Sequence, residues 1–170
     1  DLNRDDRQHF SHARPKTLPA EVLLDAISQT TGVPEKFNGW PDGVRSIQVW
    51  DNRMPSYFFR IFGRPVRATV CECERSNEPS ISQALHLLNS PEVHAKLTHR
   101  HGLARKLAAT PKSNDELVDE IYLSTLTRFP TAEEKALMSS AFETAGANRY
   151  QAVEDVLWAV LNTKEFLYNH

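Results

Sequence analysis

Two cysteines placed two residues apart are the side chains of this chain best suited to chemistry. They stand in the run Cys71-Glu-Cys-Glu-Arg75. In an extended segment, side chains at positions i and i+2 point to the same side, so the two thiolates could bind one soft metal ion, zinc or copper. His86 or His94 would then be further ligands. The spacing therefore predicts an incomplete metal site.

The same cysteines have two other interpretations. Free cysteine is commonly a small buried hydrophobic residue, and this structural role is the one we prefer. A disulfide between Cys71 and Cys73 would join Cα atoms roughly 6.5 Å apart in extended chain, near the upper limit for a bridge. Such a strained bridge would be easily reduced and therefore redox-active. The sequence leaves the buried, bridged and metal-bound states open.

Three arginines lie close to the cysteines in sequence. Their guanidinium groups could lower the thiol pKa values or bind an anionic substrate through paired hydrogen bonds. Arginines among glutamates also form ion pairs that hold a loop, which is the plainer alternative. The candidate redox or metal residues are Cys71, Cys73 and His86, and the candidate anion or substrate contacts are Arg64, Arg67 and Arg75.

The remaining histidines and the known active-site motifs add no catalytic residue. His94 and His99 are five positions apart and do not share a helical face, so we interpret them, with His101, as a solvated helix end. The chain has no G-x-S-x-G elbow, no glycine-rich phosphate loop and no H-E-x-x-H helix. Whether the chain is an enzyme stays open.

Aromatic side chains concentrate in the loop-rich first half of the chain. They could line a ligand groove, for instance for a sugar, or anchor a partner domain. They could equally form a satellite core under long loops, which is the interpretation we prefer. The residues are Trp40, Trp50, Tyr57, Phe58, Phe59 and Phe62.

Composition predicts one folded domain. The 170 residues are 40% hydrophobic and 25% charged, which is ordinary globular usage. The formal charge of -2 provides no cationic field for nucleic acid, which we exclude as a partner. No apolar run approaches the roughly 20 residues needed to cross a bilayer, so we expect no membrane insertion.

Helix start signals and apolar periodicity predict the secondary structure of the second half of the chain. Residues 79–170 predict a series of short helices, one running from Ser90-Pro91-Glu92 to about Ala109 and two starting at the capping boxes of Ser113 and Thr131. Apolar residues at helical spacing predict the core: Leu117, Val118, Ile121, Tyr122 and Leu126, then Val153, Val156, Leu157, Val160 and Leu161.

The first half predicts less regular structure. A helix is expected over residues 19–31, ended by Gly32, and a short aromatic helix from Tyr57 to Gly63. Turn dipeptides between them predict loops, with one short strand over residues 46–50. We therefore predict an all-α, mainly α-helical fold: a multi-helix single domain over residues 17–170, with a loop-rich N-terminal third and one short β element. Residues 1–16 are predicted to be a polar N-terminal extension.

Several runs of the chain resemble a known family. They are Phe62-Gly-Arg-Pro-Val-Arg67, Cys71-Glu-Cys-Glu-Arg75 and Gln83-Ala-Leu-His-Leu-Leu-Asn89, with residues 18–26 and 31–34 upstream and 122–131 and 157–166 downstream. Together they resemble the C-terminal domain of unknown function of large planctomycete cytochrome-c-containing proteins. The resemblance covers most of residues 17–170.

The resemblance implies a setting and no catalytic residues. It implies that the chain is the C-terminal part of a longer exported protein, periplasmic or extracytoplasmic, with a cytochrome-c-like domain. Because this chain lacks the haem attachment pattern C-x-x-C-H, any haem would lie in another domain, and no cofactor beyond a metal ion is expected here. We expect a helical scaffold or interaction module whose partners are other domains of the same polypeptide or another protein. The alternative is a metal-binding or thiol-redox component of an enzyme, centred on Cys71 and Cys73.

Overall fold

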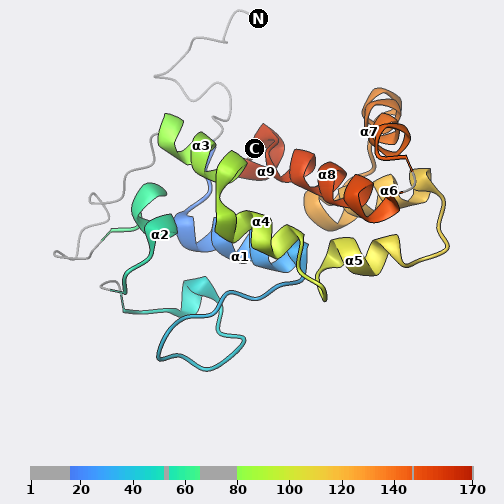
Figure 1. The fold of residues 1–170 in the computed structure, drawn as a ribbon. Coiled ribbons are helices and arrows are strands. Elements are labelled where there is room, and N and C mark those ends of the chain that lie inside the picture. Colours follow the sequence, from blue (N-terminus) through green and yellow to red (C-terminus); the bar gives the residue numbers. More distant parts are fainter. Residues whose placement is uncertain (1–15, 52–53, 66–79, 147, 170) are drawn as a thin grey trace, which may run out of the picture.

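The described part of the chain is almost entirely helical. The computed structural model describes residues 16–51, 54–65, 80–146 and 148–169. This confirms the predicted mainly α-helical fold (Figure 1). The elements are β1 (Lys16–Thr17), α1 (Ala20–Thr31), the 3-10 helix η1 (Ser46–Gln48), α2 (Tyr57–Ile61), α3 (Ile81–Asn89), α4 (Pro91–Leu97), α5 (Leu103–Ala108), α6 (Asn114–Leu126), α7 (Ala132–Thr144), α8 (Arg149–Leu161), α9 (Lys164–Leu167) and β2 (Tyr168–Asn169).

Helices α6, α7 and α8 pack together, and α6 and α7 begin at the predicted capping boxes. The hydroxyls of Ser113 and Thr131 accept the backbone N–H groups of Glu116 and Glu134, which closes both predicted capping boxes. Helix α8 packs against α5, α6 and α7. The predicted apolar stripes of α6 and α8 are buried, except that Leu126 is half-buried. The core prediction is therefore confirmed.

The predicted helix from Ser90 to about Ala109 was wrong, because the structure divides it into α4 and α5. Gly102 caps α5 and lies against the end of α1. A Cβ atom at this position would stand 3.1 Å from the carbonyl oxygen of His99 and 3.2 Å from that of Thr31. A continuous helix would move Gly102 away from α1, so tertiary contact overrides helix propensity here.

The strand predicted over residues 46–50 was also wrong. This segment contains η1, because the Asp25 carboxylate of α1 accepts the backbone N–H groups of Ser46 at 2.6 Å and Ile47 at 3.2 Å. A carboxylate at the start of a short helix satisfies N–H groups that a strand would need a partner for. Within the described ranges the β structure is instead the pair β1 and β2, in which Lys16 lies opposite Asn169.

Helices α1, α2 and α3 lie at the other end of the described fold from α6 and α7, and α3 carries His86 (Figure 1). Helix α1 ends at Gly32, which takes a left-handed conformation with φ 69°, as predicted. Helix α2 ends before Gly63, also at positive φ. Among the helices described, none combines the length and apolar character required to span a membrane.

Candidate functional site

Helices α2 and α3 are packed together, and the segment carrying the cysteines joins them in sequence. The Gln83 side-chain amide donates to the carbonyl oxygen of Ile61 at 3.1 Å. The imidazole of His86 lies among the rings of α2, with its centroid 5.3 Å from that of Tyr57 and 5.7 Å from that of Phe58. Of the candidate residues, His86 lies at this junction, and Arg64 follows the C-terminal end of α2. Cys71, Cys73, Arg67 and Arg75 lie outside the described residues.

The His86 imidazole is partly buried against α2. Burial among the aromatic rings lowers its pKa, and the charge of Glu92 opposes this only in part. The buried Nε2 atom has no hydrogen-bond partner. A neutral imidazole with a free nitrogen can accept a proton or bind a metal ion. In the described ranges, however, no group of three or more His, Cys, Asp or Glu side chains is placed to hold a metal.

Arg64 forms a buried contact between α1, α2 and the loop that follows η1. Its side chain is 5% exposed, and its Nε lies 3.3 Å from the carboxylate of Glu21. Its Nη2 donates to the carbonyl of Val49, and its guanidinium stacks 4.3 Å from the ring centroid of Phe59. These partners hold three segments together. The predicted role of Arg64 as an anion or substrate contact stays a prediction.

The histidines of α4 and the following turn are exposed. His94 lies on the surface of α4, and the backbone N–H of His101 donates to Nδ1 of His99 at 3.2 Å. They form a solvated surface, as the spacing predicts. His94 therefore lies on α4 and does not join His86 in the ring cluster.

The aromatic residues divide into a core set and an exposed set. Phe58 and Phe62 stack at 4.4 Å between centroids, and Phe59 stacks on Phe37 at 6.1 Å; all four are buried. The phenylalanines are therefore buried as predicted, but they belong to the hydrophobic core that also contains α6 and α8, not to a separate satellite cluster. Trp50 and Tyr57 are exposed instead.

Helix α3 presents an apolar face to solvent. Ile81, Leu85 and Leu88 are 80%, 54% and 42% exposed. Their spacing of i, i+4 and i+7 places them on one side of the helix. The opposite side, which carries Gln83 and His86, faces α2. The helix therefore turns its more polar side inward and its aliphatic side outward.

An apolar cavity of about 340 Å³ adjoins this face. Its walls combine the C-terminal end of α2, α3, the start of α1, the β1 segment, and the segment of α9 and β2. The lining side chains are Thr17, Leu18, Leu23, Phe62, Ser80, Ile81, Gln83, Ala84, Leu87, Leu167 and Tyr168. Ile81 belongs both to the cavity and to the exposed face, so the two form one continuous apolar surface.

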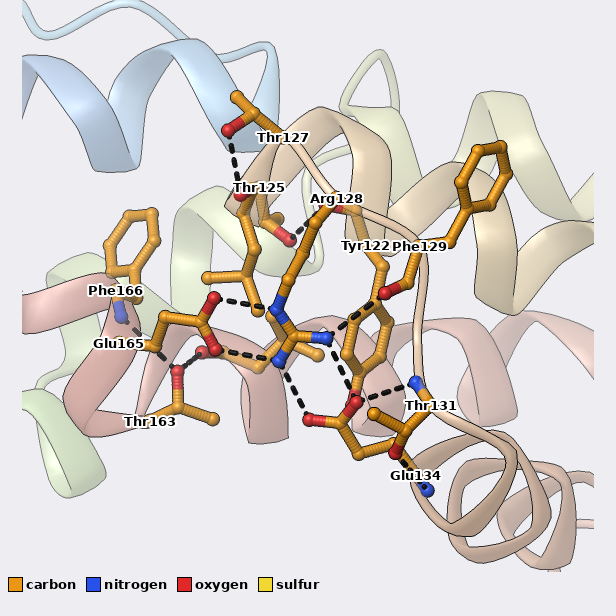
Figure 2. Close-up of polar contacts among 12 residues, drawn as sticks. Tyr122, Thr125, Thr127, Arg128, Phe129, Thr131, Glu134, Thr163, Glu165 and Phe166 are labelled. Atoms are coloured by element: carbon orange, nitrogen blue, oxygen red, sulfur yellow. Dashed lines mark hydrogen bonds and ion pairs between the residues drawn. The ribbon is translucent and has the colours of Figure 1, made fainter.

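A second cluster, centred on Arg128, was missed by the sequence reasoning. Figure 2 shows its guanidinium between two carboxylates, one from α7 and one from α9. Arg128 donates to Glu165 through Nε and Nη2, both at 2.6 Å, and to Glu134 through Nη1 at 2.9 Å and Nη2 at 2.8 Å. It also lies 5.5 Å from the ring centroid of Tyr122. The cluster ties α6, α7 and α9 together.

The charges of Arg128 and Glu134 stabilise each other. Hydrogen bonds from Arg128, and then from the backbone of Thr131, lower the pKa of Glu134 to about 2. The same carboxylates raise the pKa of Arg128. A carboxylate held this far below its usual range is poorly suited to act as a proton donor or acceptor near neutral pH. The geometry therefore indicates a structural junction.

A weak signal for this junction was present in the sequence. Arg128 lies in the run of residues 122–131 and Glu165 in the run of residues 157–166, and both runs carry the resemblance described above. They meet at this ion cluster in the folded chain. Only Glu134 was singled out in advance, as a capping residue.

Comparison with known proteins identifies a family. The model of the family described as "Protein of unknown function (DUF1553)", PSD1, matches residues 2–142. No curated protein and no solved structure matches the chain.

Proposed function

We propose that this chain, which belongs to the DUF1553 family of proteins of unknown function, is a helical interaction module that docks a protein partner through one face of α3. The observation that carries this proposal is the outward orientation of Ile81, Leu85 and Leu88 beside the apolar cavity. Contiguous apolar surface of this kind marks sites of interaction. By contrast, the guanidinium groups of Arg64 and Arg128 are engaged in structural contacts.

The setting we propose follows from the resemblance of the sequence runs. We place the module in an exported, periplasmic protein of planctomycetes that also carries a cytochrome-c-like domain. Its partners would be other domains of that polypeptide or a separate protein. Fractionation of the native host, with immunodetection of this domain, tests the location. Recovery of the domain in the cytoplasmic fraction would remove this part of the proposal.

Hydrogen exchange tests whether the α3 face is covered in the native protein. Amide exchange of α3 would be measured by mass spectrometry in the dilute purified chain and in the intact protein isolated from its host. We expect slower exchange of α3 in the intact protein, because docking of a partner stabilises the helix. Helix α7 serves as the internal reference. Equal exchange of α3 in the two samples would refute the proposal.

A metal or thiol-redox centre at Cys71 and Cys73 is the second candidate function. The observation in its favour is the buried, unpartnered Nε2 of His86, on the helix that follows the cysteine segment in sequence. Elemental analysis and a thiol count, with the double variant Cys71→Ser/Cys73→Ser, decide between the two. Stoichiometric metal that is lost in the variant would support the centre. No metal and two unreactive thiols that need denaturant to react would support the interaction module.

A further inference from the structure

We infer that Trp40 and Trp50 form a platform that binds neutral, β-linked pyranose sugars. Both residues belong to the loop of residues 33–51 that contains η1, which extends below α1 in Figure 1, whereas α3 lies above α1. The two ring centroids are 5.7 Å apart at an interplanar angle of 70°, so one indole meets the other edge to face. Trp50 is nevertheless 77% exposed, and most of its ring is therefore open to a ligand.

Both rings stand on anchored backbone. The backbone N–H of Trp40 donates to the carbonyl oxygen of Phe37 at 3.0 Å, and Phe37 is buried in the core. Trp50 follows Val49, which is buried and whose carbonyl accepts a hydrogen bond from Arg64. A ligand that stacks on this platform therefore orders little of the protein, which lowers the entropic cost of binding.

The exposed apolar area suits a sugar ring better than a protein. Trp50 and Ile47 are the exposed large hydrophobic side chains of residues 33–51. One aromatic side chain buries at most ~250 Å², so the two residues together fall well below the ~800 Å² per partner of a standard protein interface. The indole face of Trp50 is large enough to cover the apolar C–H face of one six-membered sugar ring.

The charges of the loop indicate that the ligand is neutral. Lys36 pairs with Asp42 at 3.7 Å, and Arg45 pairs with Asp25 of α1 at 3.5 Å. Asp51, which follows Trp50, is also engaged by another group. An ionic ligand would have to compete with these partners, whereas a neutral ligand would not.

Neighbouring amides can recognise the hydroxyl groups of a sugar. Asn38 lies two residues before Trp40 and Gln48 two residues before Trp50, and both side chains are exposed. An amide side chain both donates and accepts hydrogen bonds, as hydroxyl groups require. In β-linked glucose and xylose polymers the ring hydroxyls are equatorial, so they point outward from the stacked ring toward such groups. An apolar platform with a few polar groups beside it is the usual composition of a small-ligand site.

NMR titration of the full chain with cellotetraose tests the inference. The chain contains three tryptophans, so the indole N–H signals of Trp40 and Trp50 are compared directly with that of Trp158 on α8. One stacked sugar ring makes few contacts, so we expect a dissociation constant in the roughly millimolar range. The signals of Trp40 and Trp50 should shift and saturate, while that of Trp158 should stay in place.

Variants show whether the platform causes the shifts. Trp50→Ala should abolish the shift of the Trp40 signal, and the matched control Trp158→Ala should bind like the wild type. Trp50→Phe keeps an aromatic face and should retain weaker binding, which separates loss of the platform from disturbance of the loop. Circular dichroism verifies that each variant is folded.

Four outcomes overturn the inference. They are the absence of a saturable shift up to about 20 mM cellotetraose, an equal shift of the Trp158 signal, binding that survives in folded Trp50→Ala, and a response to polygalacturonate or phosphatidylcholine vesicles without one to cellotetraose. The last would assign the rings to an acidic polymer or to a lipid surface. The inference does not depend on the α3 face, so each of the two proposals stands or fails by its own experiment.

Discussion

Replacing Arg128 with methionine should destabilise the domain through the two carboxylates that it leaves behind. Methionine keeps a long apolar side chain beside Tyr122 but removes all four hydrogen bonds to Glu134 and Glu165. Both carboxylates then lose their shared cation, and α7 and α9 lose their common anchor on the turn after α6. The variant therefore tests whether this cluster is the junction that the geometry indicates.

The pKa of Glu134 gives the scale of the effect. A change from 4.5 to about 2 corresponds to about 3.4 kcal/mol at about 1.36 kcal/mol per pKa unit. The carboxylate is about one third exposed, so solvent screening reduces this to about 1–2 kcal/mol. With the two hydrogen bonds to Glu165 also lost, we expect a loss of about 2 kcal/mol in the free energy of unfolding. For a chain of this length that lowers Tm by about 4–8 °C.

Urea unfolding at pH 7 measures the loss, with Lys135→Met as the matched control. Lys135 makes a single ion pair, 2.7 Å from Asp119, at nearly the same exposure. Its removal should cost about 0.5 kcal/mol, because one screened pair contributes little. If Arg128→Met costs no more than this control, the reasoning about the cluster fails.

The pH dependence of the free energy of unfolding provides an independent check that the pKa of Glu134 is lowered in the folded state. Because the pKa of Glu134 is depressed in the folded state, its stabilisation is complete above pH 4.5 and is lost as pH falls toward about 2. In Arg128→Met the pKa of Glu134 should return toward its usual value. The difference in unfolding free energy between wild type and variant should therefore narrow across this range. A difference that stays constant down to low pH would contradict the account.

Two further predictions concern Arg64 and His86. Arg64→Met should cost about 3 kcal/mol in the free energy of unfolding, because it removes the buried ion pair with Glu21, the hydrogen bond to Val49 and the stacking on Phe59. Arg60→Met on the exposed side of α2 should cost no more than about 0.5 kcal/mol. Equal costs of the two variants in urea unfolding would refute the contribution of the buried pair. NMR titration should place the pKa of His86 below 6.5. The contribution of neutral His86 to the free energy of unfolding is then complete above pH 6.5 and decreases as the pH falls. His86→Phe should remove this pH dependence. A His86 pKa at or above 6.5 would show that burial does not control it.

The candidate site was predictable only where its signal was local. The aromatic helix α2 and its buried phenylalanines followed from helical spacing and Gly63. The ion-pair partner of Arg64 could not be predicted, because Glu21 lies on another helix and the glutamates nearer in sequence were the obvious alternatives. The aliphatic stripe of α3 is visible in the sequence, but a stripe normally faces the core. Its outward orientation depends on the contacts that Gln83 and His86 make with α2.

By itself, the sequence determined the helices whose ends and faces are defined by neighbours three or four residues away. The capping boxes at Ser113 and Thr131 and the buried stripe of α8 are of this kind, since each bond or contact closes within one helical turn. Tertiary structure decided the rest. The break at Gly102 needs the end of α1, η1 needs the carboxylate of Asp25, and Arg128 needs Glu165. Each depends on a group distant in sequence, and only the folded chain brings such groups together.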